Sequence, residues 1–211
     1  MDKAELTELL QKAYRQYARV LAFAVLGMIM GALLMNSFLE YRNKQVEEIS
    51  TTTEVATPAL PRSMPIKLRV PKIALETVFE APLGLNDDLT VEVPDLYTTV
   101  GWYKNGATPG EVGTAVVLGH VDSFQGPAVF FDLKKLAQGD VIEVEREDGT
   151  TAVFEVERVK SYAQKDFPTE DVYGPTDVAV LRLITCTGTF DKGKQKYSHN
   201  LVVYASLKES K

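Results

Sequence analysis

The hydrophobic pattern divides the chain into one long apolar stretch near its start and many short apolar segments after it. Residues 20–35 read VLAFAVLGMIMGALLM and carry no charged side chain, and NSFL extends this stretch to Leu39. An α-helix of about 20 residues covers the roughly 30 Å hydrocarbon core of a bilayer. The pattern therefore predicts a transmembrane helix over residues 18–39.

Charged residues on the two sides of this stretch predict its orientation. Lys12, Arg15 and Arg19 precede it with no acid between them, whereas the following residues mix acids and bases. The positive-inside rule then places residues 1–17 in the cytoplasm and everything after Leu39 outside the cell. The apolar core is longer than that of a cleaved signal peptide, and no convincing small-x-small cleavage site follows it. We therefore expect a retained, single-pass anchor in the cell membrane.

Composition changes twice after the apolar stretch. Residues 47–62, EEISTTTEVATPALPR, are rich in Thr, Ala and Pro and show no sustained apolar period, which is typical of a linker. From about Met64 onward, short β-type segments alternate with Gly, Pro, Asn and Asp. We expect an extracellular stalk over residues 40–62 and a folded domain over residues 63–211.

The segments of this domain predict strands of two kinds. Residues 140–162 contain two alternating runs joined by Asp148-Gly149, which is a hairpin signal. Three nearly continuous apolar runs predict central strands that are buried on both faces: TAVVLGHV, VAVLRLIT and NLVVYASL. AVFFDLKKLAQGD, residues 128–140, predicts one short helix ending at Gly139. The expected fold is mainly β, a single closed β-barrel with one or two short helices.

Composition narrows the function classes. The chain has 211 residues and a net charge of −6, with no basic stripe that would favour nucleic acid as a partner. One cysteine cannot form an internal disulfide, and two histidines make an all-protein zinc site improbable. We expect neither a metal nor another cofactor.

Two residues at the ends of predicted strands are candidates for chemistry. His120 lies in the segment Gly119–Ser123, which follows the strand 114–118, and Cys186 follows the strand 178–185. Taken singly, a lone Cys is usually a small buried hydrophobe, and a lone His in a loop is usually solvated. Outside the cell, however, an unpaired thiol is prone to oxidation, so keeping one indicates reactivity with some protection. A nearby imidazole would give such a thiol a proton acceptor.

The residues around this pair resemble the sortase family of cysteine transpeptidases. The similarity is carried by GHVDS…GPAVF and by LRLITCTGTFD…Y…NLVVYA, with VGWYKNGATPGEVGTAVVLGHVD and FPTEDVYG also fitting. It covers roughly residues 65–207 and is greatest to the class F branch of Gram-positive bacteria. A single N-terminal anchor also fits a sortase that faces the cell wall.

The resemblance implies a function for each of the two residues. Cys186 matches the nucleophile, which would attack the Thr–Gly carbonyl of an LPXTG-like sorting signal and form a thioacyl-enzyme. His120 matches the acid/base, which would protonate the departing amine and deprotonate the incoming one. The acceptor would be an amine such as a peptidoglycan stem or cross-bridge. The implied role is the anchoring of surface proteins to the cell wall.

The family's third element, an arginine that binds the substrate backbone and the oxyanion, has no direct match. Asn200 stands roughly where that arginine is expected. Arg182 is our first candidate for the role, because strand alternation places it on the same face as Cys186. It lies about 13 Å away along the strand, so contact with bound substrate is more plausible than contact with the thiol. Lys192, Asn200 itself and the backbone N–H groups of residues 187–188 are the alternatives.

Two neighbouring side chains and two rival functions stay open from the sequence alone. Asp122 either orients the imidazole or caps its own turn, and Thr185 either donates to substrate or packs within its strand. Another Cys–His enzyme, an L,D-transpeptidase or a papain-like hydrolase, lacks its expected sequence context here. The alternative from a different class is a membrane-tethered β-barrel binding module without catalysis, in which Cys186 is incidental.

Overall fold

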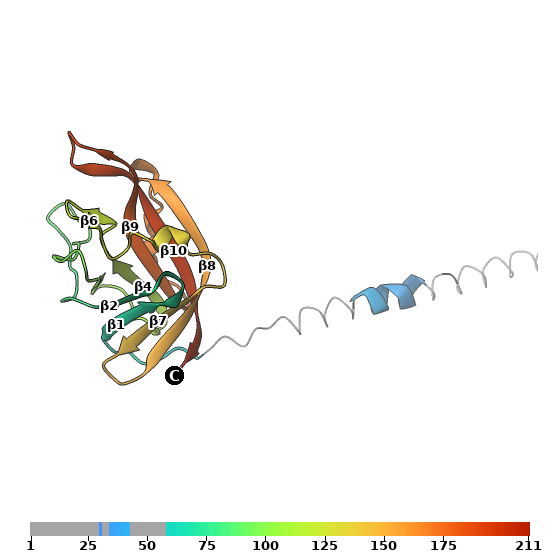
Figure 1. The fold of residues 1–211 in the computed structure, drawn as a ribbon. Coiled ribbons are helices and arrows are strands. Elements are labelled where there is room, and N and C mark those ends of the chain that lie inside the picture. The colour runs from blue at the N-terminus through green and yellow to red at the C-terminus, as the bar shows by residue number, and fades with distance from the viewer. Residues whose placement is uncertain (1–29, 31–33, 43–57) are drawn as a thin grey trace, which may run out of the picture. The chain divides into compact units, whose positions relative to one another are not determined.

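The computed structural model describes residue 30, residues 34–42 and residues 58–211 (Figure 1). The chain divides into two compact units, Met1–Val55 and Ala56–Lys211. In the first unit, residues 34–42 are helical. Among the described residues no helix has both the length and the apolar character needed to cross a bilayer.

Three predicted segments lie largely outside the residues that the structure describes. The cytoplasmic segment 1–17 and most of the anchor 18–39 and of the stalk 40–62 lie outside the described residues. The predicted anchor, its orientation and the stalk therefore stay predictions.

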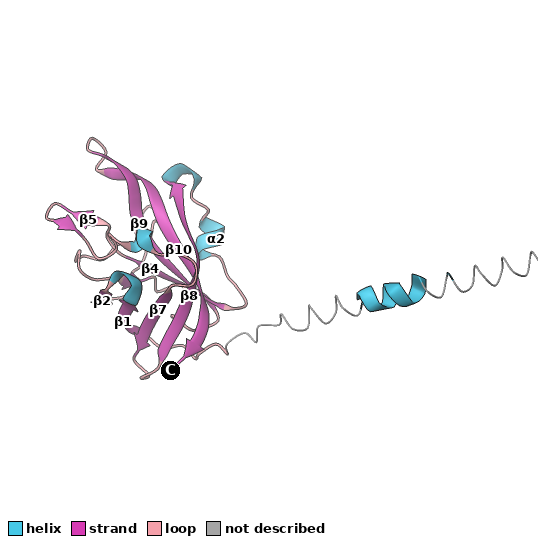
Figure 2. Ribbon diagram, turned by 45° about the vertical axis from the view of Figure 1, so that its right-hand side comes forward, coloured by secondary structure: helices cyan, strands magenta, loops and turns pink. Residues whose placement is uncertain are grey.

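The regular secondary structure of the second unit is mainly β, with short helical segments and loops between the strands (Figure 2). Its strands are β1 (Pro65–Val70), β2 (Leu75–Val78), β3 (Gly101–Trp102), β4 (Gly113–Leu118), β5 (Asp122–Ser123), β6 (Gly126–Pro127), β7 (Val141–Arg146), β8 (Thr151–Ala163), β9 (Ala179–Asp191) and β10 (Lys196–Ser210). Its helical segments are the 3₁₀ turns η1 (Pro71–Ile73), η2 (Leu133–Lys135) and η3 (Gln164–Asp166), and the α-helix α2 (Thr169–Tyr173).

The main sheet is a curled half-barrel. Its eight strands run in the order β2-β1-β7-β8-β10-β9-β4-β3, which leaves β2 and β3 as edges. Residues near these edges meet only through isolated bridges, Phe79 with Val100 and Leu83 with Tyr103. The prediction of a closed barrel was therefore wrong. The chain between β2 and β3 does not continue as paired strand, because it is interrupted by turns and bends over residues 81–99.

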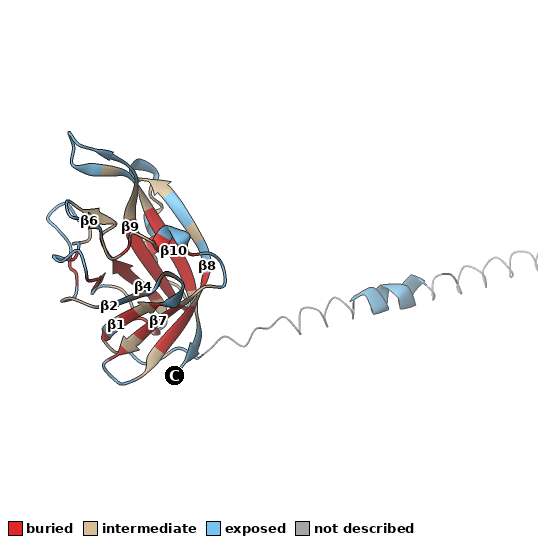
Figure 3. Ribbon diagram, in the orientation of Figure 1, coloured by how far each residue is buried: buried red, intermediate tan, exposed pale blue. Residues whose placement is uncertain are grey.

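Two hydrophobic clusters cover the two faces of the central strands (Figure 3). Alternation along β9 places Leu181 and Leu183 in the larger cluster and Ile184 in the smaller one. The larger cluster fills the concave side of the sheet. The smaller cluster lies on the other side, where Val172 of α2 packs against β4 and β10 residues. The continuous apolar runs predicted to be central strands are confirmed as such.

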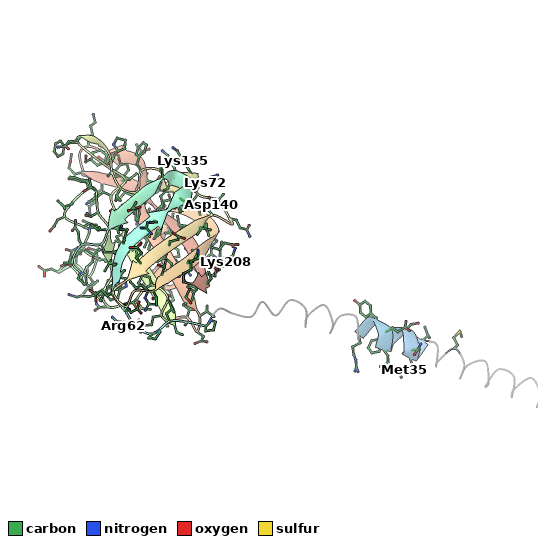
Figure 4. All side chains as sticks on the ribbon, turned by 60° about the horizontal axis from the view of Figure 1, so that its bottom comes forward. Met35, Arg62, Lys72, Lys135, Asp140 and Lys208 are labelled. Atoms are coloured by element: carbon green, nitrogen blue, oxygen red, sulfur yellow. The ribbon has the colours of Figure 1, made fainter. Side chains whose placement is uncertain are left out.

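The ends of the strands are polar. Lys208, near the end of β10 (Figure 4), forms an ion pair with Glu155 of β8. The predicted hairpin is confirmed, since β7 pairs antiparallel with β8 around Asp148-Gly149. The helix predicted over residues 128–140 is reduced to the three residues of η2. Its apolar residues serve the core instead, because Phe130 and Leu133 are fully buried.

The segment after Cys186 differs from the loop that its polar composition predicts. β9 continues to Asp191 and pairs with β10 from Lys196 onward, so residues 186–199 form a hairpin. This hairpin projects beyond the rest of the sheet (Figure 1). Gly188, with a φ of +86°, lies where the register shifts between the two strands.

Candidate active site

The pairing of β4 with β9 determines where the two candidate residues lie. The two strands are parallel neighbours, with Leu118 opposite Ile184, and the Gly119 N–H donates to the Ile184 carbonyl at 3.2 Å. His120 and Cys186 each follow two residues after one member of this last pair. Neighbouring strands lie about 4.8 Å apart. His120, just after the end of β4, and Cys186, within β9, therefore lie near the same place in the sheet, although they are far apart in the sequence.

Cys186 is half-buried at this place in the sheet. It follows Ile184 by two residues, so its side chain lies on the face that carries the smaller hydrophobic cluster. Burial raises the pKa of the Cys186 thiol, and the negative charge of Asp122 raises it further. The resting cysteine is therefore a neutral thiol that needs a proton acceptor before it can act as a nucleophile.

His120 is held by the chain segment that precedes β3. Its Nε2 lies 2.8 Å from the Pro94 carbonyl oxygen. Because a carbonyl only accepts, Nε2 carries the proton and donates it, and in the neutral ring Nδ1 is the nitrogen with a lone pair. The Tyr97 ring packs against the imidazole at a centroid distance of 4.7 Å and an interplanar angle of 53°. The imidazole is thus prepared to accept a proton at Nδ1.

A carboxylate holds the segment that contacts His120. Glu80 accepts hydrogen bonds from the N–H groups of Asp95 at 3.0 Å and Leu96 at 2.9 Å, and from the Thr99 hydroxyl. Burial raises the pKa of Glu80, but these three hydrogen bonds outweigh burial and hold the pKa below its ordinary value. Glu80 is therefore charged at neutral pH and fixes residues 94–99, which we call the 94–99 segment.

Asp122 connects the segment after His120 to the projecting hairpin. The Tyr197 hydroxyl of β10 donates to Asp122 Oδ2. This hydrogen bond is the main reason why the pKa of Tyr197 rises to about 12. Neither alternative predicted for Asp122 included this partner. The contact joins the segment that follows His120 to the hairpin that begins at Cys186.

Asn200 lies next to the thiol. In the antiparallel pairing of β10 with β9, Asn200 stands directly opposite Cys186. Side chains of directly opposed residues lie on the same face with Cβ atoms about 5 Å apart. The Asn200 amide can therefore donate a hydrogen bond to a group that is bonded to the Cys186 sulfur.

Arg182 lies on the same face but is deeply buried. Only 9% of the residue is exposed, and its guanidinium carbon lies 4.5 Å from the centroid of the Tyr204 ring. Its Nη1 donates to the Leu181 carbonyl at 3.2 Å, whereas its Nε has no hydrogen-bond partner within the described chain. Arg182 is thus buried on the same face of the sheet as Cys186, four residues before it.

A polar cluster around Arg182 connects this face of the sheet to α2. Tyr204 donates to Asp171 Oδ2 at 2.8 Å, and the hydroxyl of Tyr162 lies 2.8 Å from that of Tyr204. Arg158 lies over the Tyr204 ring, with its guanidinium carbon 3.7 Å from the centroid. These contacts fix α2 over the smaller cluster and give Arg182 a set of aromatic neighbours.

The other two predicted residues lie away from the thiol or face the core. Lys192 is exposed at the tip of the projecting hairpin, where its carbonyl accepts from the Gln195 side chain. Thr185 is 4% exposed, and its hydroxyl has no hydrogen-bond partner in the described part of the chain. Within residues 30, 34–42 and 58–211, no group of three His, Cys, Asp or Glu residues could hold a metal ion.

Sequence reasoning missed four residues around the pair: Glu80, Pro94, Tyr97 and Tyr197. Pro94 acts through its backbone carbonyl, which no residue pattern can reveal. Glu80 and Tyr97 reach the site through the fold of an irregular segment. Tyr197 could have been noticed in the sequence, because it is a bulky aromatic residue close to the start of the predicted strand NLVVYASL.

Comparisons with known proteins agree with this arrangement. The model of the sortase domain matches residues 68–208. A comparison with curated proteins finds no match. Among solved structures, the fold is similar to sortase A from Corynebacterium diphtheriae, with a TM-score of 0.53 and 20% identity over 70% of this chain and 62% of that one.

Two further solved structures show the same fold. Sortase C1 from Streptococcus agalactiae gives a TM-score of 0.52 at 20% identity, covering 68% of this chain and 66% of that one. Sortase C1 from Streptococcus suis gives a TM-score of 0.52 at 18% identity, covering 70% of this chain and 74% of that one. At these identities the likeness concerns the fold alone.

Proposed function

We infer the reaction from the family, because the chain belongs to the sortase family and is an enzyme of the cysteine transpeptidase type. We propose that it cleaves an LPXTG-like sorting signal between Thr and Gly. It then transfers the acyl group, which ends at the threonyl carbonyl, to an amine. The observation that carries this proposal is the parallel pairing of β4 with β9. His120 follows the end of β4 and Cys186 lies within β9, each two residues beyond the paired residues Leu118 and Ile184.

The first half-reaction forms a thioester. The Cys186 thiol gives its proton to Nδ1 of His120, and the sulfur attacks the threonyl carbonyl carbon. The tetrahedral intermediate collapses when the C–N bond to glycine breaks, and the imidazolium returns the proton to the departing amine. Transfer of the proton during the attack suits a thiol whose pKa is raised by burial.

The second half-reaction consumes the thioester. An incoming amine attacks the same carbonyl carbon, loses a proton to the His120 imidazole and forms an amide bond as the C–S bond breaks. The departing sulfur takes the proton back, so the enzyme is regenerated. No nucleotide is consumed, because the energy of the cleaved peptide bond is retained in the thioester.

Two side chains on the thiol's face are proposed to bind the donor peptide. The Asn200 amide, directly opposite Cys186, stabilises the negative oxygen of the tetrahedral intermediate. Arg182 would contact the part of the donor peptide that lies along β9. Its position does not allow contact with the reacting carbonyl. The proposal thus divides the role of one arginine between two residues.

The proposed setting follows from the N-terminal sequence and the family. Residues 18–39 would anchor the enzyme in the cell membrane of a Gram-positive bacterium, with the catalytic domain outside and residues 40–62 as a stalk. The physiological acceptor would be an amine of peptidoglycan, and the role would be the anchoring of surface proteins. Similarity of the motifs around Cys186 supports assignment to class F.

A cleavage assay tests this function. The wild-type domain is mixed with a fluorogenic LPXTG peptide and a glycine-based amine, and both cleavage and the amide product are measured. Cys186→Ala should abolish both signals while circular dichroism and melting temperature stay those of the wild type. Cleavage that survives in Cys186→Ala, or no cleavage of any peptide in a panel of sorting signals by the folded wild type, would overturn the proposal.

A further inference from the structure

Within the described chain, the imidazole of His120 is hydrogen-bonded to no carboxylate, although it interacts electrostatically with the Glu80 carboxylate. Its Nε2 hydrogen bond goes to a main-chain carbonyl, that of Pro94. A main-chain carbonyl orients an imidazole only as well as the chain around it is held. What holds Pro94 therefore decides which ring nitrogen of His120 carries the proton.

Irregular backbone surrounds this carbonyl. Residues 81–99 contain only turns, bends and isolated bridges, and Asp95, Leu96 and Tyr97 are exposed. Such a segment has few backbone partners of its own, since no strand ladder runs through it. Pro94 itself is buried, so the segment enters the domain at the residue that contacts His120.

Glu80 supplies the missing partners. One of its carboxylate oxygens accepts from Asp95 N–H at 3.0 Å, and the other accepts from Leu96 N–H at 2.9 Å and from the Thr99 hydroxyl. These donors lie on both sides of Tyr97. Glu80 is fixed in turn, because its own N–H donates to the Val100 carbonyl at 2.8 Å.

We propose that Glu80 is a positioning residue for the transpeptidase reaction: it gathers the 94–99 segment so that the Pro94 carbonyl and the Tyr97 ring hold the His120 imidazole with its proton on Nε2. The Nδ1 lone pair is then directed to the proton of the Cys186 thiol. The proposal rests on the proposed function for its catalytic consequence, but not for the geometry of the imidazole.

The charge of Glu80 fits this role. Three hydrogen bonds to the carboxylate keep the pKa of Glu80 low despite burial. A charged acceptor forms stronger hydrogen bonds than a neutral one, so replacement by glutamine should loosen the segment although the side chain keeps its shape. Tyr97 contributes its ring and not its hydroxyl, since the contact with His120 is between ring centroids.

Two variants and a matched control test the proposal. Glu80→Gln removes the charge, and Tyr97→Ala removes the ring. Glu76→Gln makes the same chemical change in β2, on an exposed side chain paired only with Lys67 and Arg69. We expect Glu80→Gln and Tyr97→Ala to lower kcat roughly tenfold with KM for the donor peptide unchanged. Tyr97→Phe, which restores the ring, should recover most of the kcat lost in Tyr97→Ala, and Glu76→Gln should keep the wild-type kcat.

The tautomer of His120 gives a readout that does not need activity. Nitrogen-15 NMR of the wild type should show the proton on Nε2 in the neutral ring, whereas Glu80→Gln should show a mixture of both tautomers. A wild-type tautomer and kcat in Glu80→Gln would overturn the proposal. So would a loss of activity that follows the unfolded fraction alone. If the tautomer shifts as expected but the wild type cleaves no sorting peptide, the positioning holds and the proposed function fails.

Discussion

Asn200 stands directly opposite Cys186 in the antiparallel pairing of β10 with β9. A neutral amide thus lies beside the proposed nucleophile, roughly where the resemblance to sortases implies an arginine. An amide can donate to a developing oxyanion, but it adds no positive charge. This relationship sets the expectations for both candidate donors.

Removing the Asn200 amide should slow thioester formation. Asn200→Ala is expected to reduce the acylation rate roughly 10²-fold, because one oxyanion donor contributes about that much to the rate. Stopped-flow fluorescence with a quenched donor peptide measures this step. Asn105→Ala, which removes an exposed amide bonded to the Tyr103 hydroxyl, is the matched control and should be silent. An Asn200→Ala variant that acylates at the wild-type rate would exclude Asn200 as the donor.

Arg182 should act on binding rather than on rate. Arg182→Met keeps most of the side-chain volume but removes the positive charge. The KM for the donor peptide should therefore rise about five-fold, whereas the maximal acylation rate should change less than three-fold. Burial lowers the pKa of Arg182 and makes its charge costly to keep, so stability should be unchanged or higher by about 1 kcal/mol. A loss of 10²-fold in the acylation rate at normal KM would instead assign the oxyanion role to Arg182.

Asp122 should suppress the reactivity of the resting thiol. Its negative charge raises the pKa of Cys186 beyond the effect of burial, so Asp122→Asn should lower that pKa, because a neutral neighbour disfavours the thiolate less. Alkylation of Cys186 by iodoacetamide near pH 8 should become about two- to five-fold faster, and its pH midpoint should move to lower pH. Asp177→Asn, on an exposed residue, is the control. An unchanged midpoint in Asp122→Asn would show that burial alone sets the pKa.

Gly119 should tolerate no side chain. A Cβ at this position would lie 2.6 Å from a ring carbon of Phe130 and 2.9 Å from Val129, so Gly119→Ala must displace either the core or the backbone of His120. We expect a loss of about 1–3 kcal/mol in the free energy of unfolding, measured by denaturant titration. Gly193→Ala, at the exposed hairpin tip, should change it by less than about 0.5 kcal/mol. Equal stability of both variants would contradict the packing described for Gly119.

The sequence predicted the strands, but not how they are arranged, and the reactivity of the His120–Cys186 pair stays a prediction. The apolar run before His120 and the one before Cys186 predicted central strands, and both are buried. That these two runs pair in parallel depends on contacts across 60 or more residues, which alternation cannot specify. The prediction of a closed barrel was wrong because the two edge strands of the sheet are too short to pair with each other in a ladder.

The site was predicted where side-chain chemistry is distinctive and missed where the backbone acts. His120 and Cys186 could be proposed from the sequence because their side-chain chemistry, and the apolar runs that precede them, are visible there. The Pro94 carbonyl that binds His120 has no residue signature, and the Glu80 carboxylate that holds its segment resembles any surface acid. The polar composition of residues 187–199, with Gly and several Lys, hides the strand ends that form the projecting hairpin.

The proposed reaction depends on a covalent bond between the donor peptide and Cys186. The direct measurement is intact-protein mass spectrometry after the wild type is mixed with excess LPXTG peptide without an amine and quenched in acid. We expect an added mass equal to the peptide up to its threonyl residue, mapped to the fragment that contains Cys186 and lost when an amine is added before the quench. A folded enzyme that consumes the peptide without such an adduct, or that carries it on another residue, would contradict the account.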